Sequence, residues 1–326
     1  MEFAKVSILI PVYKVESFIE KCVRSLFEQT FADIEYIFVD DCSPDSSINI
    51  LEHLLLEYPE RRKQVKIIRN QTNKGIAYVR NILIENATGD YIYFVDSDDW
   101  IEKNTIELLF SEAMKTNAEI VGGDYFYSYV DMEYLMVNAY SKKKMDCLRN
   151  VISMDIKPVL WLFLIKRSLF VDNELQFEPK IDIGEDYIMC IKLFFYARKI
   201  AYISIPLYHY MMVNNNSYRN NILKYRNETE KAIKKVQNFF LEKGIYEDIK
   251  YSLDKRKYIF KTKYLLENIN VDFDGYLSTF PELNGMWRKQ NYRKDIQLYF
   301  YFVEKKMYMF ARFLNLCRKL YRKLKY

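Results

Sequence analysis

The sequence is poor in several residue types that would point to particular functions. Its 326 residues include only two histidines and five cysteines, and no two cysteines form a CxxC pair. This spacing excludes a structural zinc knuckle and a disulfide framework, and it is typical of a reducing cytoplasm. The eight glycines form no GxGxxG motif after any strand-like segment, which argues against a nicotinamide-dependent dehydrogenase.

Long apolar runs and a strong charge of one sign are also absent. No run approaches the roughly 20 apolar residues of a transmembrane helix. A strand-like segment begins at Val6, so we expect no signal peptide before it. The net charge of +5 is too small to indicate nucleic-acid binding. We therefore expect a cytoplasmic protein that binds no nucleic acid.

The first 120 residues alternate between strand and helix patterns. Strands are expected at residues 6–13, 34–39, 65–68 and 91–95, and amphipathic helices at 15–29, 46–58 and 76–86. Such alternation predicts an α/β fold whose parallel sheet has right-handed crossovers. Polar residues follow three of the strands and should meet at one edge of the sheet, where open α/β sheets bind ligands.

Three carboxylates directly follow the apolar strand at 91–95, namely those of Asp96, Asp98 and Asp99. They would repel one another unless a positive group lay among them. Hard oxygen ligands suit Mg²⁺ or Mn²⁺. Capping of the next helix would explain one aspartate, such as Asp99, but not all three. The stretch therefore predicts a divalent cation that carries a phosphate-bearing ligand.

Four motifs occur in order within the first 120 residues: Val6–Tyr13, Val39–Asp45, Asn73-Lys-Gly75 with Arg80-Asn81, and Asp96–Asp99. Together they resemble the motifs of the family 2 glycosyltransferases, strongly over about residues 5–125 and more weakly to about residue 218 through Gly184-Glu-Asp186. The resemblance implies the GT-A fold, a Rossmann-like, mostly parallel central sheet flanked by helices. It also implies an inverting sugar transfer from a nucleotide diphosphate donor.

The same resemblance suggests how the chain is divided. Residues 1–220 would form the GT-A domain, with a nucleotide-sugar-binding half at 1–120 and an acceptor-binding half at 121–220. Residues 221–326 would form a helical extension that ends in a basic amphipathic helix.

The resemblance assigns a set of residues to the nucleotide: Pro11, Val12, Tyr13, Asp40, Asp41, Asn73, Gly75, Arg80, Asp96 and Ser97. In this assignment Tyr13 stacks on the base, Asp41 accepts the N3–H of uracil, and Arg80 clamps the diphosphate. Structural alternatives stay open, because Tyr13 could pack ordinarily and Arg80 could form a surface ion pair. The two aspartates could also belong to a turn before a capped helix. Cys42 stands where many relatives have glycine.

The resemblance also assigns the metal and the catalytic base. Within the DxD motif Asp96-Ser-Asp98, Asp98 would bind Mn²⁺ or Mg²⁺, and Asp96 would hold the ribose hydroxyls or a metal-bound water. The cation would neutralise charge on the leaving diphosphate. An inverting transferase needs a positioned base, and Asp186, supported by Glu185, matches the family's position for it. Carboxylates favoured at a helix N-terminus by its dipole are the alternative.

Three features of the acceptor half have open interpretations. His209, in an aromatic-His-aromatic segment, could bind the metal or fill a core position. Trp161 could stack on an acceptor sugar or be buried in the core. Ser217 and Arg219 could close over the diphosphate.

The C-terminal segment is strongly basic. From Tyr301 to the end there are eight Lys or Arg residues against the single acidic residue Glu304. Helical spacing joins its apolar residues Phe310, Phe313, Leu314, Cys317, Leu320, Tyr321 and Leu324. Such a helix can lie in the interface of an anionic membrane, here the inner face of the plasma membrane. Docking on the catalytic core, with a solvated basic face, is the alternative.

The sequence therefore predicts a metal-dependent glycosyltransferase of the hexosyltransferase class. It would move a sugar from a nucleotide diphosphate donor, with UDP favoured through Asp41, to a hydroxyl of a glycan or lipid-linked acceptor in surface polysaccharide biosynthesis. One alternative is a nucleotide-sugar-binding module without turnover. Another is a sugar nucleotidyltransferase, which would need a glycine-rich basic loop that Pro11-Val-Tyr-Lys-Val15 lacks.

Overall fold

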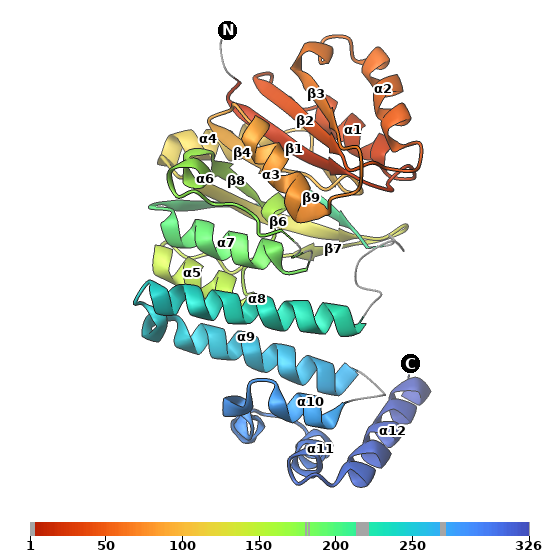
Figure 1. Cartoon of the computed structure of the whole chain (residues 1–326), viewed down its shortest axis with the longest axis vertical. Helices are drawn as coiled ribbons and strands as arrows, with labels where there is room; N and C mark the ends of the chain where they lie inside the picture. The colour runs from red at the N-terminus through yellow and green to blue at the C-terminus, as the bar shows by residue number, and fades with distance from the viewer. Residues whose placement is uncertain (1–3, 180, 182, 213–221, 268–271, 326) are drawn as a thin grey trace. The chain divides into compact units, whose positions relative to one another are not determined.

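The structure is a computed structural model that describes residues 4–179, 181, 183–212, 222–267 and 272–325 (Figure 1). It contains two compact units, residues 1–244 and 245–326. The sequence placed the end of the GT-A domain at residue 220. Helix α8 (Ile222–Glu242) packs on α7 (Glu185–Tyr196) and belongs to the first unit, so we place the boundary after α8.

In the described part of the chain the strands form one nine-stranded sheet in the order β3-β2-β1-β4-β8-β6-β9-β5, and β7 pairs with β6. The strands are β1 Val6–Val12, β2 Ile34–Asp40, β3 Val65–Arg69, β4 Tyr91–Phe94, β5 Trp100–Ile101, β6 Ile120–Ser128, β7 Glu133–Met136, β8 Phe163–Lys166 and β9 Ile200–Met211. The other helices of the first unit are α1 Ile19–Phe27, α2 Ser47–Glu57, α3 Ile76–Asn86, α4 Thr105–Thr116, α5 Lys144–Ser153 and α6 Ser168–Asp172.

The alternation predicted for the first 120 residues is confirmed. Strands β1 to β4 pair in parallel, with β1 between β2 and β4. Antiparallel pairing begins where β8 joins β4, and it continues between β8 and β6. The sheet is therefore parallel in its first half and mixed in its second, which is where the sequence pattern becomes irregular.

The core forms because the central strands are apolar on both faces. Six of the seven residues of β1 are buried, so no polar face alternates with an apolar one. This pattern is typical of a parallel strand covered on both sides. Helix α3 packs on β1 and β2, and α4 packs on β6, β8 and β9 (Figure 1). The carboxyl ends of β1, β2 and β4 thus share one edge, where the candidate residues lie.

A non-glycine residue in the left-handed region follows both β1 and β2 at this edge: Lys14 has φ 55° and Cys42 has φ 58°. The left-handed region favours glycine. The side chain of Cys42 is exposed, so the constraint at this position is conformational and not a matter of packing. This explains why glycine suits the position in the motif that the chain resembles.

The second unit is helical, as predicted. Its helices are α9 Tyr246–Glu267, α10 Phe273–Ser278, α11 Lys294–Glu304 and α12 Tyr308–Lys325. Asp272 caps α10 by accepting the N–H of Gly275 at 2.9 Å. Among the helices in the described ranges, none combines the length and the apolar character that crossing a membrane requires.

Candidate functional site

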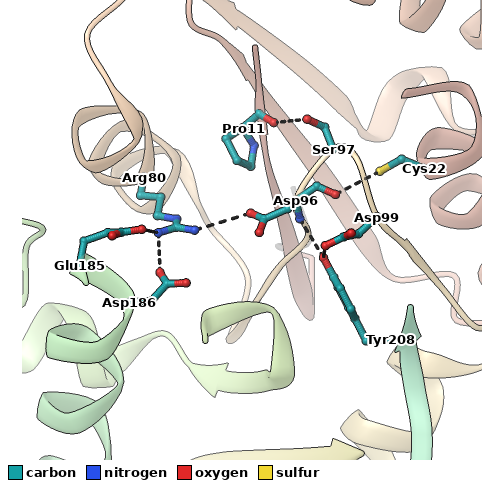
Figure 2. A network of polar contacts seen from close by, with 9 residues as sticks. All are labelled: Pro11, Cys22, Arg80, Asp96, Ser97, Asp99, Glu185, Asp186 and Tyr208. Carbon is teal, nitrogen blue, oxygen red and sulfur yellow. Dashed lines mark hydrogen bonds and ion pairs between the residues drawn. The ribbon is translucent and has the colours of Figure 1, made fainter. Parts of the chain in front are cut away.

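The aspartate turn follows β4 and is tied to the end of β1. The hydroxyl of Ser97 donates to the carbonyl of Pro11 at 2.7 Å (Figure 2). Burial alternates along the turn, because Ser97 and Asp99 are buried whereas Asp96 and Asp98 are half-buried. The turn therefore keeps two carboxylates accessible at the edge of the sheet.

Asp99 is not a helix cap, because α4 begins only at Thr105 and Asp99 is 1% exposed. Its carboxylate accepts the hydroxyl of Tyr208 and the N–H of Met211, both at 2.7 Å, and so holds β9 against the turn. Burial raises the pKa of Asp99 well above its usual range, and the charges of Asp98 and Asp96 raise it further. Sequence reasoning missed Tyr208, which also accepts the N–H of Asp96 at 3.2 Å.

Arg80 lies within the acidic cluster. Its side chain is 4% exposed, Nη1 donates to Glu185 at 2.6 Å and to Asp186, and Nη2 lies 3.6 Å from Asp96 (Figure 2). The sequence predicted a diphosphate clamp, but α3 places Arg80 on its buried face. One guanidinium thus joins the aspartate turn to the first residues of α7.

The carboxyl groups of Glu185 and Asp186 have raised pKa values. Burial raises the pKa of Asp186 to about 8, against the lowering effect of Arg80, and the charges of Glu185 and Asp96 add to the rise. Burial likewise raises the pKa of Glu185. One cation is shared among three carboxylates, so the cluster binds a proton more readily than isolated carboxylates do. A carboxyl group that titrates near neutrality is suited to general base catalysis.

Gly184 positions this pair, since it precedes α7 with φ 87° and a Cβ there would lie 2.7 Å from the Cβ of Ala232 on α8. Gly184→Ala should therefore combine left-handed strain with a clash and cost about 3 kcal/mol of unfolding free energy. Gly244→Ala is the matched control, because Gly244 has φ 71° but a Cβ there would meet no atom of the described residues within 4 Å. Urea denaturation compares the two, and equal stabilities would contradict the packing argument.

The paired aspartates after β2 organise their own loops. Asp41 is 4% exposed and accepts the side chain of Asn70 at 2.8 Å and the N–H groups of Lys74 at 2.8 Å and Gly75 at 2.9 Å. Asp40 accepts the N–H of Ser43 at 2.8 Å. Asp41 therefore holds the loop that leads into α3, and its contact with a base stays a prediction.

The remaining predicted nucleotide residues gather at the same edge. The N–H of Asp41 donates to the carbonyl of Val12 at 3.0 Å, which joins the ends of β1 and β2. Tyr13 and Pro11 are half-buried, and Asn73 is exposed. Gly75 has φ 86°, so glycine is required where the chain enters α3.

His209 is enclosed on all sides by protein groups. It is 6% exposed and lies between the rings of Trp100 and Phe126, each at 4.9 Å. Its Nδ1 is 2.8 Å from Glu133 and its Nε2 is 2.9 Å from Glu102. Both ring nitrogens are engaged by carboxylates, which leaves neither for a metal, so we do not retain His209 as a ligand.

Trp161 is a core residue and cannot stack on an acceptor in this arrangement. It is 2% exposed and stacks on Tyr208 at 4.2 Å and on Tyr210 at 5.5 Å. Sequence reasoning missed its neighbour Lys157, whose ammonium lies 4.5 to 4.9 Å from four ring centroids, those of Tyr125, Tyr127, Trp161 and Tyr210. No sequence pattern could have found this cluster, because separate segments supply its rings. It places a cation among aromatic rings within residues 121–220, the part predicted to bind the acceptor.

The carboxylates at this edge of the sheet could supply only some of the ligands of a bound cation. Within the part of the chain that the structure describes, no three His, Cys, Asp or Glu side chains gather as a metal site. Asp98 and Asp96 offer hard oxygen donors, which fit an Mg²⁺ or Mn²⁺ ion that takes its other ligands from phosphates and water. Ser217 and Arg219 lie outside the described residues.

Comparison with known proteins identifies relatives for much of the chain. Residues 7–162 match the model of the family described as "Glycosyl transferase family 2". The glycosyltransferase EpsH of Bacillus subtilis is 33% identical over 217 residues, which cover 64% of this chain and 61% of EpsH. A poly(ribitol-phosphate) beta-glucosyltransferase of Bacillus spizizenii is 30% identical over 220 residues, covering 66% of this chain and 33% of that protein. The chain thus spans less than two thirds of the length of either relative.

Solved structures share the fold. The structure of Staphylococcus aureus TarS 1–349 in complex with UDP-GlcNAc has a TM-score of 0.70 at 16% identity, covering 97% of this chain and 92% of that one. The mannosyltransferase PcManGT of Pyrobaculum calidifontis, in complex with GDP-Man and Mn²⁺, has a TM-score of 0.53 at 14% identity, covering 99% and 89%. The sheet and the helical region after it are thus arrangements known from other proteins.

Proposed function

This chain belongs to glycosyl transferase family 2 and has the GT-A fold, and we propose that it is an inverting, metal-dependent hexosyltransferase. Its donor is a nucleotide diphosphate sugar, and its acceptor is a hydroxyl of a glycan or lipid-linked oligosaccharide in surface polysaccharide synthesis. The observation that carries the proposal is Arg80, which links Asp96 of the aspartate turn to Glu185 and Asp186.

On the acceptor side, Asp186 is the proposed base. It takes the proton of the acceptor hydroxyl while that oxygen forms a bond to the anomeric carbon of the donor sugar. The bond between this carbon and the diphosphate oxygen breaks at the same time, and the diphosphate leaves with the electron pair. Arg80 holds the Asp186 carboxylate in place through a charge-assisted hydrogen bond. Glu185 accepts a hydrogen bond from the same guanidinium and supports Asp186 as the base.

On the donor side, Asp98 would hold Mn²⁺ or Mg²⁺, with Asp96 close to the ribose or a metal-bound water. The ion would supply neutralisation of the charge that grows on the leaving diphosphate. Asp99 and Tyr208 keep the turn in place, and Asp41 shapes the loop at Asn73 and Gly75. Support for a metal also comes from the fold shared with PcManGT, whose structure holds Mn²⁺.

A UDP-sugar is the favoured donor. The TarS structure with the same fold holds UDP-GlcNAc, and Asp41 stands where the family motif places the carboxylate that accepts the uracil N3–H. The poly(ribitol-phosphate) glucosyltransferase among the relatives favours a glycan-like acceptor. All five cysteines are free thiols, which supports a cytoplasmic location.

A donor screen tests the proposal. The full chain is incubated with Mn²⁺ and a panel of UDP-, GDP- and dTDP-sugars, with and without a glycan acceptor fraction, and the released nucleotide is measured. Release with at least one donor is expected. Calorimetric binding of a nucleotide sugar without release, in the presence of every acceptor fraction, would instead indicate a binding module without turnover.

Asp98→Asn should lower nucleotide release about 10²-fold, because it removes the charge that holds the cation at the diphosphate. The matched control is Asp90→Asn, since Asp90 precedes β4 at the opposite end of the same strand and is exposed. Release is compared at several Mn²⁺ concentrations, and high Mn²⁺ should partly restore the Asp98 variant. Release equal to that of the Asp90 variant at every Mn²⁺ concentration would refute the metal assignment.

A further inference from the structure

Helix α12 packs on its neighbours through its small and polar residues. Ala311 and Asn315 are buried, and Arg318 pairs with Asp295 of α11 at 3.2 Å while lying 5.4 Å from the Tyr299 ring. These residues follow i, i+4, i+7 spacing and therefore lie on one face of the helix. The contacts of Arg318 fix the rotation of α12 about its own axis.

The opposite face of α12 is apolar and exposed. Met309 is 85%, Phe313 69%, Leu316 53% and Leu320 53% exposed, and their i, i+4, i+7, i+11 spacing forms a single stripe. Phe310 lies beside this stripe and is also exposed. We name these five residues the apolar face. Apolar side chains gathered on one helix and exposed in this way are typical of an interaction surface.

The exposed surface continues onto the neighbouring residues. Phe310 contacts Phe302 of α11 at 5.5 Å between ring centroids, and Leu298, Tyr301 and Met307 are exposed as well. Within the second unit the described residues of the apolar face therefore remain exposed, and the alternative of docking on the catalytic core stays a prediction. Arg318 points inward to Asp295, whereas Phe313 and Leu320 are exposed.

Charge indicates what covers the apolar face. Helix α12 contains six Lys or Arg residues and no Asp or Glu. A helix that combines an apolar stripe with this charge can lie in the interface of an anionic bilayer, where each cation near the surface adds attraction. Two copies of this chain would instead bring like charges together if they met through α12.

We propose that the apolar face of α12 inserts into the surface of a membrane that contains anionic lipid. The helix lies along the bilayer, with Met309, Phe313, Leu316 and Leu320 directed toward the acyl chains. The net positive charge of the helix attracts the anionic lipid head groups. This attachment is independent of sugar transfer, since none of these residues belongs to the candidate site.

Vesicle flotation of the full chain tests the proposal. The chain should float with vesicles of phosphatidylcholine and phosphatidylglycerol mixed about two to one, and more weakly at high salt or with phosphatidylcholine alone. The triple variant Phe313→Gln, Leu316→Gln, Leu320→Gln should lower the partition coefficient at least about tenfold. Glutamine keeps helix propensity, and an unchanged melting temperature shows that the variant is folded.

A second triple variant, Leu56→Gln, Val171→Gln, Leu241→Gln, is the matched control, because it removes three exposed apolar side chains elsewhere and should float like the wild type. Wild-type protein that does not float with the anionic vesicles would overturn the proposal, and so would equal flotation of the α12 variant. Sedimentation velocity provides another test. A wild-type dimer that the α12 variant dissociates, without any flotation, would assign the face to a second copy and also overturn it.

Discussion

Replacing Asp186 with asparagine is expected to lower kcat for sugar transfer about 10³-fold while leaving donor affinity within about twofold. The amide has nearly the same shape as the carboxyl group and can still accept from Arg80, so the position of α7 should be retained. It cannot accept the proton of the acceptor hydroxyl. The loss should therefore appear in the chemical step and not in donor binding.

Transfer kinetics together with donor calorimetry make this measurement. The wild-type kcat/KM should rise with pH toward a plateau above about 8, because Asp186 must lose its proton before it can act as a base and its pKa is about 8. The residual activity of the variant should lack that rise. Asp172→Asn, at an exposed carboxylate in the same half of the chain, is the control. A variant that keeps both the wild-type kcat and its pH profile would exclude Asp186 as the base.

The part of the fold that was predicted correctly is the part that local periodicity determines. Helix α3 was predicted at 76–86 and is found at Ile76–Asn86, and β2 was predicted at 34–39 and is found at Ile34–Asp40. In these segments the spacing of the apolar residues fits one kind of secondary structure, a helix or a strand. The antiparallel strand β8 carries no such signal, because its place between β4 and β6 depends on partners distant in sequence.

The candidate site shows the same division between local and distant contacts. Motif order located Asp96, Asp98 and Asp186, but their partners could not be inferred from it. Asp99 was interpreted as a cap, yet its partner Tyr208 is 109 residues away. Arg80 was placed on the diphosphate, yet it binds carboxylates 105 and 106 residues away. A motif determines which chemical groups are present. The tertiary fold determines which of these groups can contact a ligand and which contact each other.

For the C-terminal helix, the sequence predicted the amphipathic pattern but not its orientation. Apolar spacing alone is compatible with a face directed inward or outward. The orientation depends on Asp295 and Tyr299, which hold Arg318, and on the small side chain of Ala311. Contacts outside α12 therefore determine that its apolar residues are exposed.

Arg80→Met is expected to destabilise the folded chain by about 3–5 kcal/mol at alkaline pH, because it leaves three neighbouring carboxylates without their buried cation. The loss should depend on pH. Arg80 lowers the pKa of both Asp186 and Glu185, so its removal raises these values further. Below its folded pKa each carboxyl group is protonated and its repulsion disappears.

The sign of the pH dependence follows from proton linkage. In the wild type, Asp186 has a folded pKa of about 8, above its unfolded value, so the folded state binds more protons and stability falls as pH rises toward 8. In the variant this decline continues to higher pH, because the folded pKa is higher still. The difference in unfolding free energy between the two proteins should therefore widen as pH rises through about 8 and narrow below it.

Urea denaturation at about pH 6 and about pH 9 measures this difference. Arg149→Met is the matched control: its exposed pair with Asp146 on α5 should contribute less than about 1 kcal/mol at either pH. Transfer activity of the Arg80 variant should also reach its plateau at higher pH than the wild type, since the base keeps its proton longer. A loss of stability that is the same at both pH values would show that Arg80 acts by packing alone. In that case the guanidinium of Arg80 would not be the group that holds the pKa of Asp186 near neutral pH, where the carboxylate can accept a proton.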